Sequence, residues 1–146
     1  RRPATVIAYV DTSTLIKVIV DEPGSEMAAQ IWETADTLAA VRLIEVEARA
    51  ALAAALRAGR LTTARHRRAV KVLTELLNQL DLIEVTADII TVAGRLAEAH
   101  ALRGSDAVHL AGAVLVGADV LTSADTTLCD AASAEGIAVA NPLNRP

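Results

Sequence analysis

Short apolar runs alternate with long helix-forming stretches along this chain, and the alternation constrains the fold more than any other feature of the sequence. Residues 6–10 form a β-branched and apolar run that is broken by Asp11, which is typical of a buried strand ending in a turn. Residues 42–58 contain no Gly or Pro and are rich in Ala and Leu, which favours a helix. Strands alternating with helices predict an α/β fold with a mainly parallel sheet.

The same patterns divide the rest of the chain. A helix is expected to start at Thr12, to stop at Pro23 and Gly24, and to restart through about Asp36. The other expected helices are residues 42–58, 62–80, 88–101, 105–116 and 125–135, and the expected strands are residues 6–10, 37–41, 82–85, 120–123 and 137–140. A length of 146 residues suits one hydrophobic core, so we expect residues 1–146 to form a single domain.

Composition limits the kinds of site that the chain can hold and the cell compartments in which we expect it to act. Cys129 is the only cysteine, which excludes an internal disulfide and a thiolate metal cluster. The longest apolar stretch, residues 111–118, is far shorter than the roughly 18 to 20 residues that cross a bilayer. The apolar run after Arg1 and Arg2 ends at Asp11 without a signal-peptide cleavage pattern. We therefore expect a cytoplasmic protein that does not enter a membrane.

Charge is unevenly distributed along the chain. The formal net charge of −4 argues against binding to nucleic acid through a general positive field. The stretch from residue 49 to residue 71 nevertheless contains no Asp or Glu, and its basic residues are Arg49, Arg57, Arg60, Arg65, Arg67, Arg68 and Lys71. This surface would steer RNA, receive an acidic segment of a partner protein, or simply be a solvated helical face.

Four carboxylates are expected to converge. Asp11 and Asp125 directly follow predicted strands, and Glu45 and Asp106 lie near the starts of the helices at residues 42–58 and 105–116. In a parallel α/β sheet all four positions face the carboxyl ends of the strands, where ligands bind. Carboxylates packed together at neutral pH repel one another unless a cation intervenes. Oxygen ligands without His or Cys favour Mg²⁺ or Mn²⁺ over zinc.

A metal at this position would activate water for attack on a phosphodiester. Asp11 and Asp106 are the first choices as direct ligands, while Glu45 and Asp125 ligate the metal or position water. The hydroxyls of Ser13 and Ser123 either orient water or phosphate, or make turn and capping hydrogen bonds. His109 follows Asp106 by three residues in an apolar run, and the surrounding sequence favours a structural histidine.

Four segments of the chain carry a resemblance to a known family. They are VDTSTL at residues 10–15, RLIEV at 42–46, GSDAVHLA at 104–111 and LTSAD at 121–125. In order, spacing and predicted context these segments resemble PIN domains of the VapC toxin family. The resemblance spans nearly the whole chain and is carried by the combination, because each segment alone is a weak motif.

The resemblance implies a three-layer α/β/α sandwich and a Mg²⁺- or Mn²⁺-dependent endoribonuclease. It also implies a toxin that forms a homodimer and is neutralised by a VapB-type antitoxin. It assigns the metal site to Asp11, Glu45, Asp106 and Asp125. Only the resemblance favours RNA, because the same metal chemistry would cut DNA.

Two other classes of function fit the sequence less well. A catalytically silent PIN-like module would bind RNA or protein only, and the retention of all four acids counts against it. A phosphoryl-transfer domain would use Asp11 as its nucleophile, but the sequence after Asp11 lacks a second Asp two places on.

Overall fold

A computed structural model describes residues 5–144 and shows one five-stranded sheet. The strands are β1 (Ile7–Val10), β2 (Thr37–Val41), β3 (Leu80–Ile83), β4 (Val120–Thr122) and β5 (Ala138–Ala140). The helices are α1 (Thr12–Ile19), α2 (Ser25–Thr34), α3 (Leu43–Arg57), α4 (Thr63–Leu77), α5 (Ala87–His100), α6 (Gly104–Val116) and α7 (Thr126–Ala134). The order in the sheet is β3-β2-β1-β4-β5, and every pairing is parallel.

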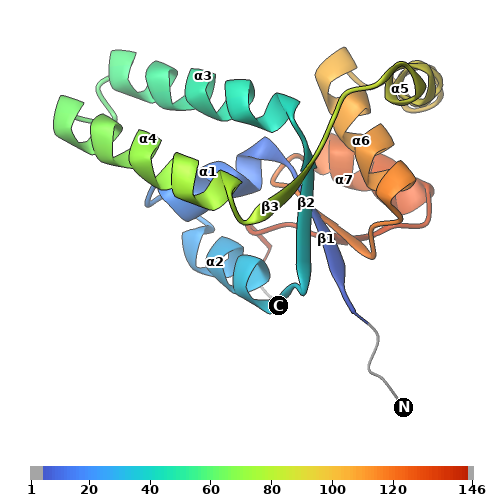
Figure 1. The fold of residues 1–146 in the computed structure, drawn as a ribbon, viewed down its shortest axis with the longest axis horizontal. Coiled ribbons are helices and arrows are strands. Elements are labelled where there is room, and N and C mark those ends of the chain that lie inside the picture. Colours follow the sequence, from blue (N-terminus) through green and yellow to red (C-terminus); the bar gives the residue numbers. More distant parts are fainter. Residues whose placement is uncertain (1–4, 145–146) are drawn as a thin grey trace.

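The helices form two outer layers. Helices α1 to α4 lie on one side of the sheet and α5 to α7 on the other, as Figure 1 shows. This arrangement confirms the expected three-layer α/β/α sandwich, and the sheet is wholly rather than mainly parallel. No helix within residues 5–144 combines the length and the apolar character needed to span a membrane.

The predicted boundary between α4 and β3 was wrong, and β3 lies at Leu80–Ile83 rather than at residues 82–85. The sequence predicts a helix through Leu80, because the apolar spacing of α4 continues to that residue. In the structure α4 ends at Leu77, and Leu80 begins β3, where it pairs with Leu38. A buried leucine satisfies the periodicity of a helix and that of a strand equally well, so the pattern alone could not place the boundary.

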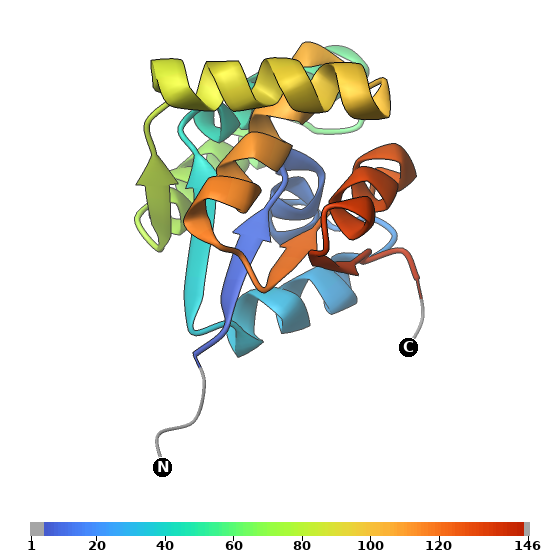
Figure 2. The same ribbon diagram turned by 90° about the vertical axis from the view of Figure 1, so that its right-hand side faces the viewer.

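The order of the strands positions the site. After β3 the chain crosses the sheet and adds β4 on the other side of β1, so the connections from β1 and β4 leave toward opposite layers (Figure 2). Tyr9 pairs with Leu121 in this central pair. In open α/β sheets a ligand crevice forms at the carboxyl ends of two such strands, and Asp11 is the first residue after β1.

Helix α6 approaches the sheet closely through a glycine. A Cβ atom added at Gly112 would lie 2.7 Å from Cγ1 of Val41 and 3.1 Å from the Tyr9 ring. Val41 and Tyr9 are fully buried, so neither can move into solvent to make room. Glycine at this position therefore sets the distance between α6 and the central strands.

Gly112→Ala should lower the free energy of unfolding. Overpacking costs about 1 to 3 kcal/mol, which should outweigh the helix-propensity gain of roughly 1 kcal/mol. Gly94→Ala in α5 is the matched control, because its added Cβ meets nothing within 4 Å. The control should be stabilised by about 0.5 to 1 kcal/mol. Urea denaturation measures both changes, and equal effects at the two positions would contradict the close approach.

Candidate functional site

Three of the four predicted acids meet at the carboxyl end of the central strands. Asp11 follows β1, Asp106 lies in the first turn of α6, and Asp125 is the N-cap of α7. Arg103 joins two of them, with its Nε atom 3.3 Å from Oδ2 of Asp106 and an Nη atom 3.9 Å from Oδ2 of Asp125. Burial raises the pKa of Asp106, and the charges of Asp125 and Asp11 add to the increase while Arg103 opposes it.

Asp11 is held by two hydroxyl groups. Ser13 and Ser123 each donate a hydrogen bond of 2.7 Å to its Oδ2 atom. The Oδ1 atom lies 3.9 Å from Nε2 of His109. The carboxylate is only 6% exposed, so its orientation is set by these contacts rather than by solvent. The two serine hydroxyls therefore orient Asp11, a role that the sequence interpretation did not include among its alternatives.

Asp125 caps a helix with one carboxylate oxygen and faces the other acids with the second. Its Oδ1 atom accepts hydrogen bonds from the backbone N–H groups of Thr127 at 2.9 Å and Leu128 at 3.3 Å, which caps α7. Its Oδ2 atom faces Arg103 and the other acids. One oxygen stabilises the helix, while the other remains on the side of the candidate site.

Glu45 is not brought into this cluster, and Glu47 occupies the corresponding place. Glu45 lines a separate groove with Val46 and Arg49. Oε1 of Glu47 accepts hydrogen bonds from the Thr12 hydroxyl at 2.9 Å and from Nε2 of His109 at 2.5 Å. Two residues along a helix correspond to a rotation of about 200°, so both glutamates cannot face the same site. The structure therefore places Glu47, and not Glu45, beside His109 and Thr12.

His109 connects this glutamate to the core. Its ring is 1% exposed, and its Nδ1 atom lies 2.8 Å from the Tyr9 hydroxyl oxygen. Burial alone would lower the pKa of His109, but the hydrogen bond to Glu47 and the charges of Asp11, Glu47 and Asp106 outweigh it and raise the pKa. Partial burial acts to raise the pKa of Glu47, and the contacts with His109 and Thr12 lower it overall. Both shifts favour a charged carboxylate at Glu47.

The site suits a divalent cation in its donor chemistry. Asp11, Glu47, Asp106 and Asp125 offer only carboxylate oxygens, which hard cations such as Mg²⁺ and Mn²⁺ prefer. Within residues 5–144 no three acidic, His or Cys side chains are arranged as a formed metal site. Oδ2 of Asp106 is directed at Arg103, so ligation would require this side chain to turn.

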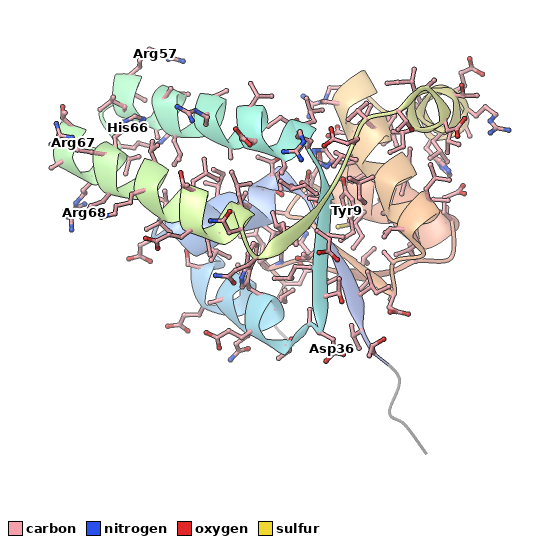
Figure 3. The ribbon with its side chains drawn as sticks, viewed as in Figure 1. Tyr9, Asp36, Arg57, His66, Arg67 and Arg68 are labelled. Atoms are coloured by element: carbon pink, nitrogen blue, oxygen red, sulfur yellow. The ribbon has the colours of Figure 1, made fainter. Side chains whose placement is uncertain are left out.

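A basic groove lies apart from the acids. It runs between the end of α1 and helix α4. Its lining includes the apolar Ile19, Val20 and Leu61, the basic Arg60, Arg65 and Arg68, and one acid, Asp21. Figure 3 shows Arg67 and Arg68 of α4 pointing away from Tyr9, near the outer end of the α3–α4 hairpin. The basic stretch of the sequence thus forms an apolar groove edged by cations at some distance from the carboxylates.

Another groove carries exposed apolar side chains. It is lined in part by Val46 of α3, by Val85 before α5, and by Ile90 of α5. These side chains are 60%, 40% and 54% exposed, respectively. Exposed apolar residues that gather in this way often mark a protein interface.

Comparison with known proteins agrees with this architecture. The family model described as PIN domain matches residues 8–134. The chain is 40% identical over 136 residues to ribonuclease VapC45 of Mycobacterium tuberculosis, covering 92% of this chain and 94% of the relative. Among solved structures, VapC20 of Mycobacterium tuberculosis, described as a sarcin-ricin loop cleaving toxin, has a TM-score of 0.67 at 19% identity and covers 95% of this chain and 99% of its own.

A toxin-antitoxin complex from Klebsiella pneumoniae is also similar in structure. Its matching chain has a TM-score of 0.65 at 20% identity, covering 92% of this chain and 97% of that one. At such identities the two solved structures support the fold alone, whereas the match to VapC45 extends to the sequence.

Proposed function

The chain belongs to the PIN domain family, among its VapC ribonucleases, and from that premise we propose that it is a metal-dependent endoribonuclease toxin. Mg²⁺ or Mn²⁺ would be held by Asp11, Glu47, Asp106 and Asp125. The observation that carries the proposal is that Asp11, Asp106 and Asp125 lie at the carboxyl ends of β1 and β4. Glu47 lies near Asp11 through its contact with His109. A structural role would not require so many acids on one side of a buried strand pair.

The residues of the site have different roles in the proposed hydrolysis. When bound, the cation activates a water molecule and neutralises charge on the leaving oxygen. Asp11 presents its Oδ1 atom in a fixed direction, because both hydroxyl donors are on Oδ2. Glu47 and Asp106 complete the ligand set, and Asp125 contributes the oxygen that does not cap α7. Arg103 is 81% exposed beside these acids and is placed to contact a phosphate of the RNA.

The partners follow from the two grooves. We propose that a VapB-type antitoxin lays an acidic, partly apolar segment into the basic groove lined by Arg60, Arg65 and Arg68. The exposed apolar residues Val46 and Ile90 support a homodimer formed through the other groove. We also propose that residues 1–146 form a single PIN domain and that the protein acts in the cytoplasm.

Cleavage of RNA by the purified, antitoxin-free chain tests this function. Structured and unstructured RNAs and a total cellular RNA pool are incubated with Mg²⁺ or Mn²⁺, with EDTA as the control. Single-stranded DNA of matching sequence is tested in parallel. We expect cutting of RNA that requires the metal.

Other results would contradict the proposal in different ways. Cleavage in EDTA would exclude the metal mechanism, and equal cutting of DNA would favour a less selective nuclease. Mn²⁺ binding without cleavage of any RNA in the pool would favour the catalytically silent binding module.

Reversing charge in the basic groove should weaken binding of the antitoxin. Arg65→Glu combined with Arg68→Glu places like charges against an acidic segment, so affinity should fall at least about tenfold. Isothermal titration with peptides from the antitoxin measures the change. Arg95→Glu is the matched control, because Arg95 is exposed on α5 in the opposite layer. Equal losses of affinity in the groove variant and in Arg95→Glu would show a general effect of charge rather than binding in the groove.

A further inference from the structure

Three polar side chains form a continuous chain from the core to the carboxylate site. The backbone N–H of Val41 donates to the Tyr9 hydroxyl at 3.0 Å, and that hydroxyl lies 2.8 Å from Nδ1 of His109. Nε2 of His109 then contacts Glu47 at 2.5 Å. Tyr9 is fully buried and His109 almost so, whereas Glu47 is partly exposed. The chain therefore ends on the one member that faces the site.

Counting hydrogens gives the direction of each bond. The Tyr9 oxygen accepts from Val41, so its single hydrogen needs an acceptor of its own. Nδ1 of His109 is the partner that the structure provides within residues 5–144. An unprotonated Nδ1 places the ring hydrogen of the neutral imidazole on Nε2, which then donates to Glu47.

We propose that Tyr9 and His109 are positioning residues that set the orientation of the Glu47 carboxylate, with Tyr9 donating to Nδ1 of His109 and His109 donating from Nε2 to Glu47. The inference rests on the proposed function in giving Glu47 a role at the metal. Both hydrogen bonds to Glu47 end on Oε1, from His109 and from Thr12. The carboxylate is therefore held from one side, and Oε2 is the atom left to face a cation. Partners of this kind orient carboxylate and histidine ligands in metal sites generally.

The rigidity of the chain is the reason that it can position a side chain. Glutamate has three rotatable bonds and loses considerable rotamer entropy when it is ordered. Tyr9 lies on β1 and is anchored to β2 through Val41, and His109 lies on α6. Glu47 is thus tied to two strands and a helix other than its own. Gly112, one turn beyond His109 on α6, brings that helix close enough for the hydroxyl to reach the ring.

A matched pair of amide variants tests the positioning role. In His109→Gln the side-chain amide reaches the place of Nε2 and can still donate to Glu47, whereas the shorter amide of His109→Asn mimics only Nδ1. Mn²⁺ affinity is measured by the electron paramagnetic resonance signal of free Mn²⁺, with circular dichroism to establish folding. We expect His109→Gln to bind close to the unaltered chain, and His109→Asn to bind about 10- to 100-fold more weakly. Equal affinities in two folded variants would overturn the proposal.

The nitrogen spectrum of the unaltered chain tests the tautomer directly. In ¹⁵N NMR the His109 signals are assigned by their absence from His109→Gln. We expect a protonated Nε2 and an unprotonated Nδ1, and a shifted Nδ1 signal in Tyr9→Phe, which lacks the hydroxyl that donates to Nδ1. A doubly protonated ring, or an unchanged Nδ1 signal in folded Tyr9→Phe, would overturn the assignment.

The two measurements separate this proposal from the proposed function. If the unaltered chain binds no Mn²⁺, the metal mechanism fails. The nitrogen spectrum then still decides whether Tyr9 and His109 orient Glu47.

Discussion

Asp11→Asn should reduce metal-dependent RNA cleavage by at least about 100-fold while leaving the fold intact. The amide has the shape of the carboxylate, and its oxygen can still accept the hydrogen bonds that Ser13 and Ser123 donate to Oδ2. What the substitution removes is the negative charge at the end of β1. Cleavage rates under single-turnover conditions measure the loss of activity. Thermal denaturation with and without Mn²⁺ measures metal binding separately. Mn²⁺ should raise the melting temperature of the unaltered chain and not that of the variant.

Asp119→Asn is the matched control for Asp11→Asn. Asp119 precedes β4 at the opposite end of the sheet, where its carboxylate accepts a hydrogen bond from the Ile7 N–H group. An aspartate there is far from the other acids along the strand direction, so cleavage and the effect of Mn²⁺ should be preserved. Full activity of Asp11→Asn, or equal losses in the two variants, would contradict the site.

Glu47→Gln should weaken Mn²⁺ binding by about 10- to 100-fold and slow cleavage with it. Glu45→Gln should leave both close to those of the unaltered chain. The amide oxygen at residue 47 can keep the hydrogen bonds from Thr12 and His109, so the loss reports the missing charge rather than a broken contact. The two glutamates belong to the same helix and undergo the same chemical change. Titration of Mn²⁺ and cleavage of RNA at saturating metal measure the difference.

The reverse result would restore the assignment made from sequence. If Glu45→Gln lost activity and Glu47→Gln retained it, Glu45 would be the functional residue, and the contact of Glu47 with His109 would be structural.

The positions of the three aspartates could be predicted from sequence because local structure determines them. Asp11 interrupts an apolar strand, and Asp125 begins a helix shortly after another strand. Asp106 lies in the first turn of a helix that starts at Gly104. In parallel sheets the ends of strands and the starts of the following helices share one edge. Three short motifs and one rule of topology were therefore enough to predict that these residues lie at the same edge of the sheet.

The choice between Glu45 and Glu47 could not be made in the same way. Both lie near the start of α3, and they flank its buried stripe of Ile44, Ala48 and Leu52 on opposite sides. The apolar periodicity shows which face packs on the core, and it does not show what lies beside each edge of that face. The contacts of Glu47 come from Thr12 and His109, 35 and 62 residues away in the chain.

The alternation of strands and helices, the layered α/β class and the edge of the sheet where the aspartates gather could all be predicted from local sequence patterns. Each of these follows from interactions between residues close together in the chain. The end of α4, the orientation of Asp11 by two serines, and the link from Tyr9 through His109 to Glu47 became visible in the folded structure. Those features depend on which side chains meet across different elements. The pattern of a single sequence does not reveal such contacts. The position of an apolar stripe shows which face of a helix packs on the core, and it does not show which residues lie beside the polar side chains at the edges of that face.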